Sequence, residues 1–210
     1  MPRFAPRPVR FGKRPGNADD ETDGVPTPAK VKLAARRTAG IAEAKAVLAH
    51  LPRPGESLHA VVTARLDLTD VIGALLERLG HCERMMVATL GYNARNLRTM
   101  LAWLDSGAVG SLLLVASIFF RAHQGALWEE TLEELRQRKQ RAACCHSHAK
   151  VVAMAFTSGE RLSIEGSANL CGNGSGREQF ALINDPGLHD WHAAWIAALV
   201  AKHEGDSDDE

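Results

Sequence analysis

The sequence has no apolar run long enough to cross a lipid bilayer. The longest run, Ala108–Phe120, has thirteen residues, whereas a membrane-spanning helix needs about 20. The basic residues near the N-terminus are not followed by an apolar stretch, which argues against a secretory signal. The four cysteines lack the spacing of a disulfide framework, so we expect reduced thiols. These absences predict a cytoplasmic protein without stable membrane insertion.

The chain also lacks net charge, because 25 Lys and Arg residues balance 25 Asp and Glu residues. This total excludes a uniformly basic DNA-coating protein, but it hides an asymmetry. Residues 1–56 carry 11 basic and 6 acidic side chains, whereas residues 57–210 carry 14 and 19. Two interpretations of the basic excess stay open: it binds a nucleic-acid backbone, or it only solvates a tail.

The composition along the chain predicts four regions. Residues 1–30 are rich in Pro, Gly and charge, which is typical of a disordered arm. Residues 31–56 predict an alanine-rich helix that ends in a Pro-rich linker. Residues 57–203 are expected to form a single domain, and residues 204–210 an acidic tail. A chain of this length can bury a sizeable core.

Strand and helix patterns alternate within the expected domain. A capping sequence at 67–70 and the glycine at 80 mark the two ends of one helix. The alternation indicates an α/β fold with a mixed sheet flanked by helices, mixed because 149–164 forms a hairpin. We expect strands at 58–66, 84–90, 111–120, 149–156, 161–164 and 180–184, and helices at 67–79, 93–105, 124–140 and 188–202.

The residues suited to catalysis lie on this hairpin. His148 and Lys150 are two residues apart, so in a strand both side chains face the same side. The segment 166–169, Gly-Ser-Ala-Asn, ends the second strand, and the two strand ends can meet at one sheet edge. Lys, Ser and Asn side chains suit a tetrahedral phosphate, and a neutral histidine can attack phosphorus. Glu178 lies within reach to orient the imidazole.

These residues resemble the phospholipase D superfamily. Its motif is His-x-Lys, four residues and an Asp, then a Gly-Ser segment with an Asn, often followed by a further Asn and a Glu. This sequence has the same order, with Asn173 and Glu178 as the last two, but Ala155 stands where the motif has Asp. The resemblance covers roughly residues 58–200. It implies that the chain is a phosphodiesterase acting through a phosphohistidine intermediate.

The resemblance also implies a role for each motif residue. His148 is the nucleophile in one subunit and the general acid in the other. Lys150 and Asn169 hold the nonbridging phosphate oxygens, Ser167 supports them, and Glu178 orients His148. Three further residues are candidates for substrate binding, with a role in a turn as the alternative for the last: Gly166, Asn173 and Tyr92.

Enzymes of this family combine two His-x-Lys motifs in one active site, but this sequence has one motif and no internal repeat. The resemblance therefore implies a two-fold homodimer that needs no cofactor. Nucleic acid is the expected substrate. Two alternatives stay open. One is a catalytically silent nucleic-acid-binding or scaffold protein, which Ala155 favours, and the other is a lipid phosphodiesterase or phosphatidyl transferase.

Two groups of cysteines and histidines raise the alternative of a metal site. Cys144, Cys145 and His146 are consecutive, but adjacent cysteines chelate one ion poorly, and strand alternation sends Cys145 away from His146. His189 and His192 are three residues apart on a predicted helix. We expect buried thiols and a packed or surface histidine pair, with no metal.

Overall fold

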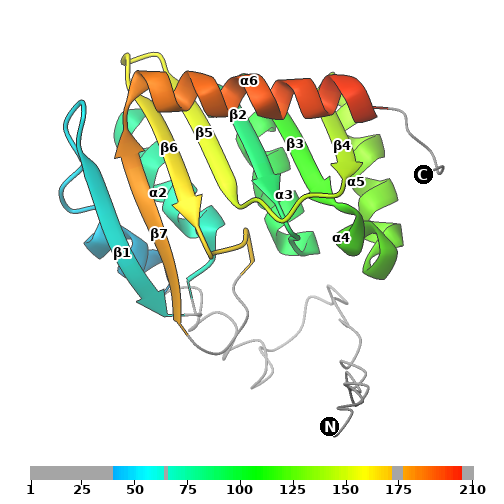
Figure 1. The fold of residues 1–210 in the computed structure, drawn as a ribbon, viewed down its shortest axis with the longest axis horizontal. Coiled ribbons are helices and arrows are strands. Elements are labelled where there is room, and N and C mark those ends of the chain that lie inside the picture. The colour runs from blue at the N-terminus through cyan, green and yellow to red at the C-terminus, as the bar shows by residue number, and fades with distance from the viewer. Residues whose placement is uncertain (1–39, 64–65, 172–176, 205–210) are drawn as a thin grey trace, which may run out of the picture.

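A computed structural model describes residues 40–63, 66–171 and 177–204 (Figure 1). The predicted arm at 1–30 and most of the acidic tail lie outside these residues. The strands are β1 (Ser57–Thr63), β2 (Cys82–Thr89), β3 (Leu112–Ser117), β4 (Arg141–Cys145), β5 (Val151–Phe156), β6 (Arg161–Gly166) and β7 (Arg177–Asn184). The helices after β1 are α2 (Leu68–Leu79), α3 (Ala94–Asp105), α4 (Ile118–His123), α5 (Gly125–Gln137) and α6 (Pro186–His203).

The seven strands form one mixed sheet in the order β1-β7-β6-β5-β2-β3-β4. Strands β2, β3 and β4 are parallel, whereas β5 pairs antiparallel with β2, and β6, β7 and β1 continue antiparallel. The predicted mixed sheet flanked by helices is therefore confirmed. We call the edge where β5 begins and β6 ends the motif edge, and the edge where β5 ends and β6 begins the far edge.

Helices cover the two faces of the sheet unequally. One face packs against α2, α3, α4 and α5, through a large core that includes Ile72, Leu97 and Phe180. The other face packs against α6 alone, which lies across the strands (Figure 1) and contributes Ile196 and Val200 to a smaller core. One face of the sheet is therefore covered by four helices and the other by a single helix.

Residues 40–47 are helical, within the range predicted for the first helix. Ala44 and Leu48 are buried in the same core as Ile72 of α2. This helix therefore packs with the body of the chain. The division of the whole chain into arm, linker, domain and tail stays a prediction.

Local sequence explains where the helices begin. At α3, the backbone N–H of Asn93 donates to Asn96 Oδ1, and the N–H of Asn96 donates to Asn93 Oδ1, each at 3.0 Å. At α6, Asp185 Oδ1 accepts from the N–H of Leu188 at 2.9 Å. Helix α2 ends at Gly80, whose φ of 82° favours glycine. The predicted ends of α2 and the start of α3 are thus confirmed.

Several element predictions were wrong in detail. Strand β1 ends at Thr63, before the predicted 66, and β7 begins at Arg177, three residues earlier than expected. The apolar run 111–120 is not one strand, because β3 ends at Ser117, whose hydroxyl accepts from Phe119 N and begins α4. Strand β4 was not predicted, since its sequence of small residues carries no clear pattern. Strand β5 begins at Val151, two residues later than expected. In the part of the chain that the structure describes, no helix is both long and apolar enough to cross a membrane.

Candidate active site

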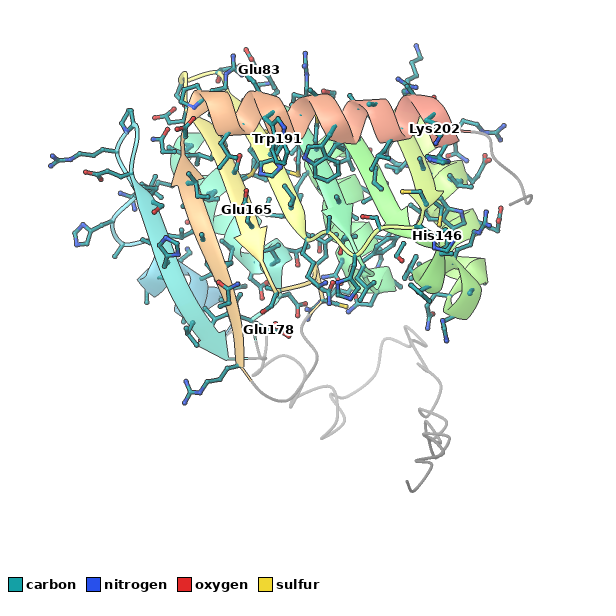
Figure 2. All side chains as sticks on the ribbon, viewed as in Figure 1. Glu83, His146, Glu165, Glu178, Trp191 and Lys202 are labelled. Carbon is teal, nitrogen blue, oxygen red and sulfur yellow. The ribbon has the colours of Figure 1, made fainter. Side chains whose placement is uncertain are left out.

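The two halves of the motif meet at the motif edge, as the sequence predicts. Val151, the first residue of β5, pairs with Glu165, the penultimate residue of β6. The segment 146–150 leads from β4 to β5, so it crosses the ends of β3 and β2, which lie between them in the sheet. Figure 2 shows His146 and Glu178 at this edge and Glu83 at the opposite one. The register therefore brings residues 148–150 beside residues 166–169.

His148 and Lys150 contact each other directly. Lys150 Nζ donates to His148 Nδ1 at 3.2 Å and to the His148 carbonyl oxygen at 3.1 Å. The pair lies in the segment before β5, so the hydrogen bonds hold the side chains together, not the strand alternation expected from the sequence. Because an ammonium only donates, Nδ1 accepts and Nε2 carries the proton of a neutral His148. His148 is exposed and Lys150 is half-buried.

The environment of Lys150 shifts its proton affinity. Partial burial lowers the pKa of the Lys150 ammonium from its ordinary value, and the charge of the Glu178 carboxylate acts in the opposite direction. A half-buried ammonium next to an exposed imidazole favours the binding of an anion, because the anion replaces the water that the ammonium has lost.

Gly166 and Ser167 lie where β6 and β7 approach closely. A Cβ atom at Gly166 would come within 2.2 Å of the carbonyl oxygen of Gln179, so the position requires glycine. The backbone N–H of Ser167 donates to that oxygen at 2.9 Å, and Ser167 Oγ accepts from Gln179 N at 3.1 Å. The hydroxyl of Ser167 donates to the carboxylate of Glu178. Close strand packing thus fixes Ser167, and Ser167 holds Glu178.

Asn169 presents an amide with an unfilled position. Its neighbours Ala168 and Leu170 are buried, with 5% and 1% of their surface exposed, and they anchor the segment. Asn169 Oδ1 is buried and has no hydrogen-bond partner among the described residues. Rotation of the amide by half a turn brings its NH₂ group to the same position. The arrangement suits a ligand that accepts a hydrogen bond from Asn169.

The structure does not bring the Tyr92 side chain to this cluster. Tyr92 is buried, its hydroxyl donates to Thr131 Oγ1 at 2.7 Å, and its ring packs on Phe120 with centroids 4.2 Å apart. Burial raises the pKa of its phenol far above the ordinary value. These contacts make the Tyr92 side chain part of the core. Asn173, another expected substrate-binding residue, lies outside the described residues.

Sequence reasoning missed Ser147. Its hydroxyl accepts from the backbone N–H of Ala149 at 3.2 Å, and this hydrogen bond closes a turn around His148. A serine in the short segment before a strand is the sequence signal for such a turn, because its hydroxyl can bond the backbone two residues later.

The histidines of α6 are engaged in other contacts. His189 is 4% exposed and its Nδ1 lies 2.8 Å from Asp190. His192 Nε2 bonds Glu165, and Trp195 Nε1 donates to His192 Nδ1 at 2.9 Å. The histidines are thus the packed pair expected from the sequence. Across residues 40–63, 66–171 and 177–204, no three His, Cys, Asp or Glu side chains are grouped to hold a metal ion.

The cysteines have the environment of packed thiols. Cys82, Cys144, Cys145 and Cys171 are all unbridged. Burial raises the pKa of Cys82 and of Cys144 to about 11, and it also raises that of Cys145. A raised pKa keeps a thiol protonated, so these three are poor nucleophiles.

Ala155 lies away from the motif edge. It occupies the far end of β5, where it pairs with Arg161 of β6 and Arg84 of β2. Replacement of the motif aspartate by alanine therefore removes no group from the cluster around His148.

No protein-family model and no curated protein matches the chain. Solved structures do match. The phospholipase D family member Nuc from Salmonella typhimurium superposes with a TM-score of 0.51 at 13% identity, covering 73% of this chain and 100% of that one. NucT from Helicobacter pylori gives 0.51 at 12% identity, covering 71% and 99%.

The polyphosphate kinase from Porphyromonas gingivalis is also similar, with a TM-score of 0.50 at 11% identity over 74% of this chain and 27% of that one. Together, the matches to Nuc, NucT and this kinase show that the chain has the fold of Nuc, a phospholipase D family member.

Proposed function

We propose that the chain is a phosphodiesterase that hydrolyses nucleic acid through a phosphohistidine intermediate, in an active site shared by two subunits. The observation that carries the proposal is the contact of Lys150 with His148, at the sheet edge to which the β5–β6 register also brings the Asn169 segment. An imidazole, an ammonium and an amide within one edge of a sheet match the needs of a phosphodiester, whose two nonbridging oxygens share a negative charge.

The reaction proceeds in two displacements. An imidazole nitrogen of His148 forms a bond to phosphorus, and the bond from phosphorus to the leaving oxygen breaks. The partner subunit's His148 gives that oxygen its proton. A water then attacks phosphorus, its proton passes to the partner's His148, and the nitrogen–phosphorus bond breaks. Atoms and charge balance without a cofactor or a metal ion.

Lys150 controls which form of His148 is present. Its hydrogen bond to Nδ1 leaves the proton of the neutral imidazole on Nε2. A bound phosphate attracts the ammonium towards its own oxygens and frees the Nδ1 lone pair. The imidazole can then act as the nucleophile, or it can take up a second proton and become the imidazolium that serves as the general acid. Two subunits allow the neutral and the protonated form to exist in one site.

Nucleic acid is the preferred substrate because the motif edge carries an aromatic and basic helix. Helix α4 begins there and presents Phe119, which is 59% exposed, together with Arg121 and His123. Exposed aromatic rings stack on bases, and cations contact the phosphate backbone. The basic excess in residues 1–56 adds attraction for a polyanion.

The test measures hydrolysis of bis-p-nitrophenyl phosphate and of labelled DNA and RNA. Wild type should cleave at least one nucleic acid with EDTA present, and H148A should not. The matched control is H146A, which removes another exposed histidine of the same edge. Equal cleavage by H148A and wild type would falsify the assignment. Binding without cleavage by wild type would favour the silent alternative, and transfer to an added alcohol would favour a phosphatidyl transferase.

The shared site has a separate test. Light scattering at micromolar concentration should give the mass of two chains. A catalytically active monomer would contradict the proposed dimer, because a single chain supplies one His148.

A further inference from the structure

A cavity of about 500 Å³ lies at the far edge, between α6 and the sheet. It is separate from the cluster around His148, because it lies at the opposite ends of β5 and β6. The residues of α6 above it include Ala193, Ala194 and Ala197. Because these side chains are small, they leave space between this part of the helix and the strands.

The floor of the cavity is a row of three residues in register across three strands. Arg161 of β6 pairs with Ala155 of β5, and Ala155 pairs with Arg84 of β2. Adjacent strands lie roughly 4.8 Å apart, so the two arginine Cα atoms are roughly 10 Å apart with an alanine between them. An arginine side chain is long enough to reach over this alanine from either side.

Neither guanidinium has a partner among the described residues. The hydrogen bonds and ion pairs of the described chain include neither the Arg84 nor the Arg161 side chain. Arg138 and Arg141, by contrast, are each paired with carboxylates. Two cations on the floor of a cavity that are not paired with a carboxylate repel each other, and an anion between them would relieve the repulsion.

The other polar groups at the cavity leave room for an anion. Asp190 lines the cavity too, and its Oδ1 lies 2.8 Å from His189 Nδ1. Glu83 also lines the cavity, at an irregularity in the pairing of β2 with β5, but among the described residues it forms no ion pair with either arginine. Ser111 adds a hydroxyl, which donates to the Glu83 carbonyl oxygen at 3.1 Å and can still accept a hydrogen bond.

We propose that this cavity binds a phosphate monoester between Arg84 and Arg161, above Ala155. Arginine contacts phosphate oxygens through paired N–H groups, which suits a dianion held from two sides. The volume exceeds that of inorganic phosphate and falls within the range of small-molecule sites, roughly 300–1,000 Å³. The shared chemistry of the ligand is the terminal phosphate, either free or as part of a nucleotide. This site does not depend on the proposed hydrolase activity.

The experiment measures phosphate binding by calorimetry on the full chain. The background is K150A, which weakens any phosphate binding at the motif edge. Inorganic phosphate and AMP are the two probes. We expect K150A to bind one anion per chain, and we expect A155D in that background to bind at least tenfold more weakly, because its carboxylate occupies the gap. Tighter binding of AMP identifies a nucleotide, and equal binding identifies free phosphate.

A second variant guards against misfolding of A155D. R84Q combined with R161Q, also in the K150A background, should lose binding by a similar factor. R53Q is the matched control, because Arg53 is exposed and lies outside the cavity. The proposal is overturned if K150A binds neither probe, or if the double arginine variant, with an unchanged melting temperature, binds as tightly as K150A alone.

Discussion

The two ends of β5 carry opposite arrangements of charge. At the motif edge, the charged and polar groups contact each other: Lys150 bonds His148, and Ser167 bonds Glu178. At the far edge, Arg84 and Arg161 flank Ala155 without partners among the described residues. Six residues of strand, roughly 20 Å, separate the two ends.

The groups proposed for catalysis thus lie at one end of β5, and Ala155, which stands where the motif has Asp, lies at the other. Groups that contact each other are already positioned for a substrate, whereas unpaired cations need a ligand. Because the ends lie beyond a Debye length of about 8 Å from one another, a charge change at one end hardly alters the other. Four predictions test this separation.

The largest effect is expected for H148A. Loss of the proposed nucleophile and general acid should lower the hydrolysis rate by at least about a thousandfold, since each such role contributes roughly 10²–10⁴. Steady-state cleavage of bis-p-nitrophenyl phosphate measures it. Urea unfolding should show little change, because the side chain is exposed. Retained activity would remove the motif edge as the site of chemistry.

G166A should damage both fold and site. The added Cβ would lie 2.2 Å from the Gln179 carbonyl oxygen and 2.7 Å from the Phe180 Cα, so β6 and β7 must separate. We expect the free energy of unfolding to fall by about 1–3 kcal/mol, with a parallel loss of activity. The control is G73A on α2, where the nearest atom is 3.7 Å away. A stable, active G166A would show that this contact does not position Ser167.

The pH dependence of hydrolysis should report Lys150. Its positive charge is needed, and its pKa is lowered from the ordinary 10.5, so activity should fall as pH rises through a value below 10.5. K150R keeps its charge to about pH 12 and should lose this alkaline fall, at lower overall rate. An alkaline limb that is the same in both variants would assign the titration to another group.

The smallest effect is expected for the stability of A155D. A carboxylate between the two unpaired arginines should raise the free energy of unfolding by about 0.2–1 kcal/mol at low salt. The gain should fade as salt screens the pairs. A155N has nearly the same shape without the charge, so urea unfolding of both variants isolates the electrostatic part. No difference between them would show that the arginines are held apart from Ala155.

The sequence predicted most of what lies close together along the chain. Capping residues Asp67 and Asn93 were visible because they precede apolar positions with a helical period, and the meeting of residues 148–150 with 166–169 followed from the hairpin that joins them. Strand β4 was not predicted, because its small residues show no alternation of apolar and polar positions. The end of β3 was not predicted, because Ser117 caps helix α4 within an apolar run.

Contacts between distant segments were beyond the sequence. The row Arg161, Ala155 and Arg84 exists only through the order of β6, β5 and β2 in the sheet. The bond of His192 to Glu165 depends likewise on where α6 crosses β6. For the same reason, the sequence placed Tyr92 in reach of a substrate, although Thr131, thirty-nine residues away, takes its hydroxyl.

The pairing of β1 with β7 has a consequence for folding. Ser57 pairs with Ile183, so the two strands are separated by more than a hundred residues of chain and form a contact of high sequence separation. Strand β7 also carries Glu178 and the Gln179 backbone that fixes Ser167. A partly folded chain in which β7 has not docked therefore lacks the contacts that hold Ser167 and Glu178, even where the His148–Lys150 pair has formed. The proposed site is complete only after the last strand of the sheet has joined it.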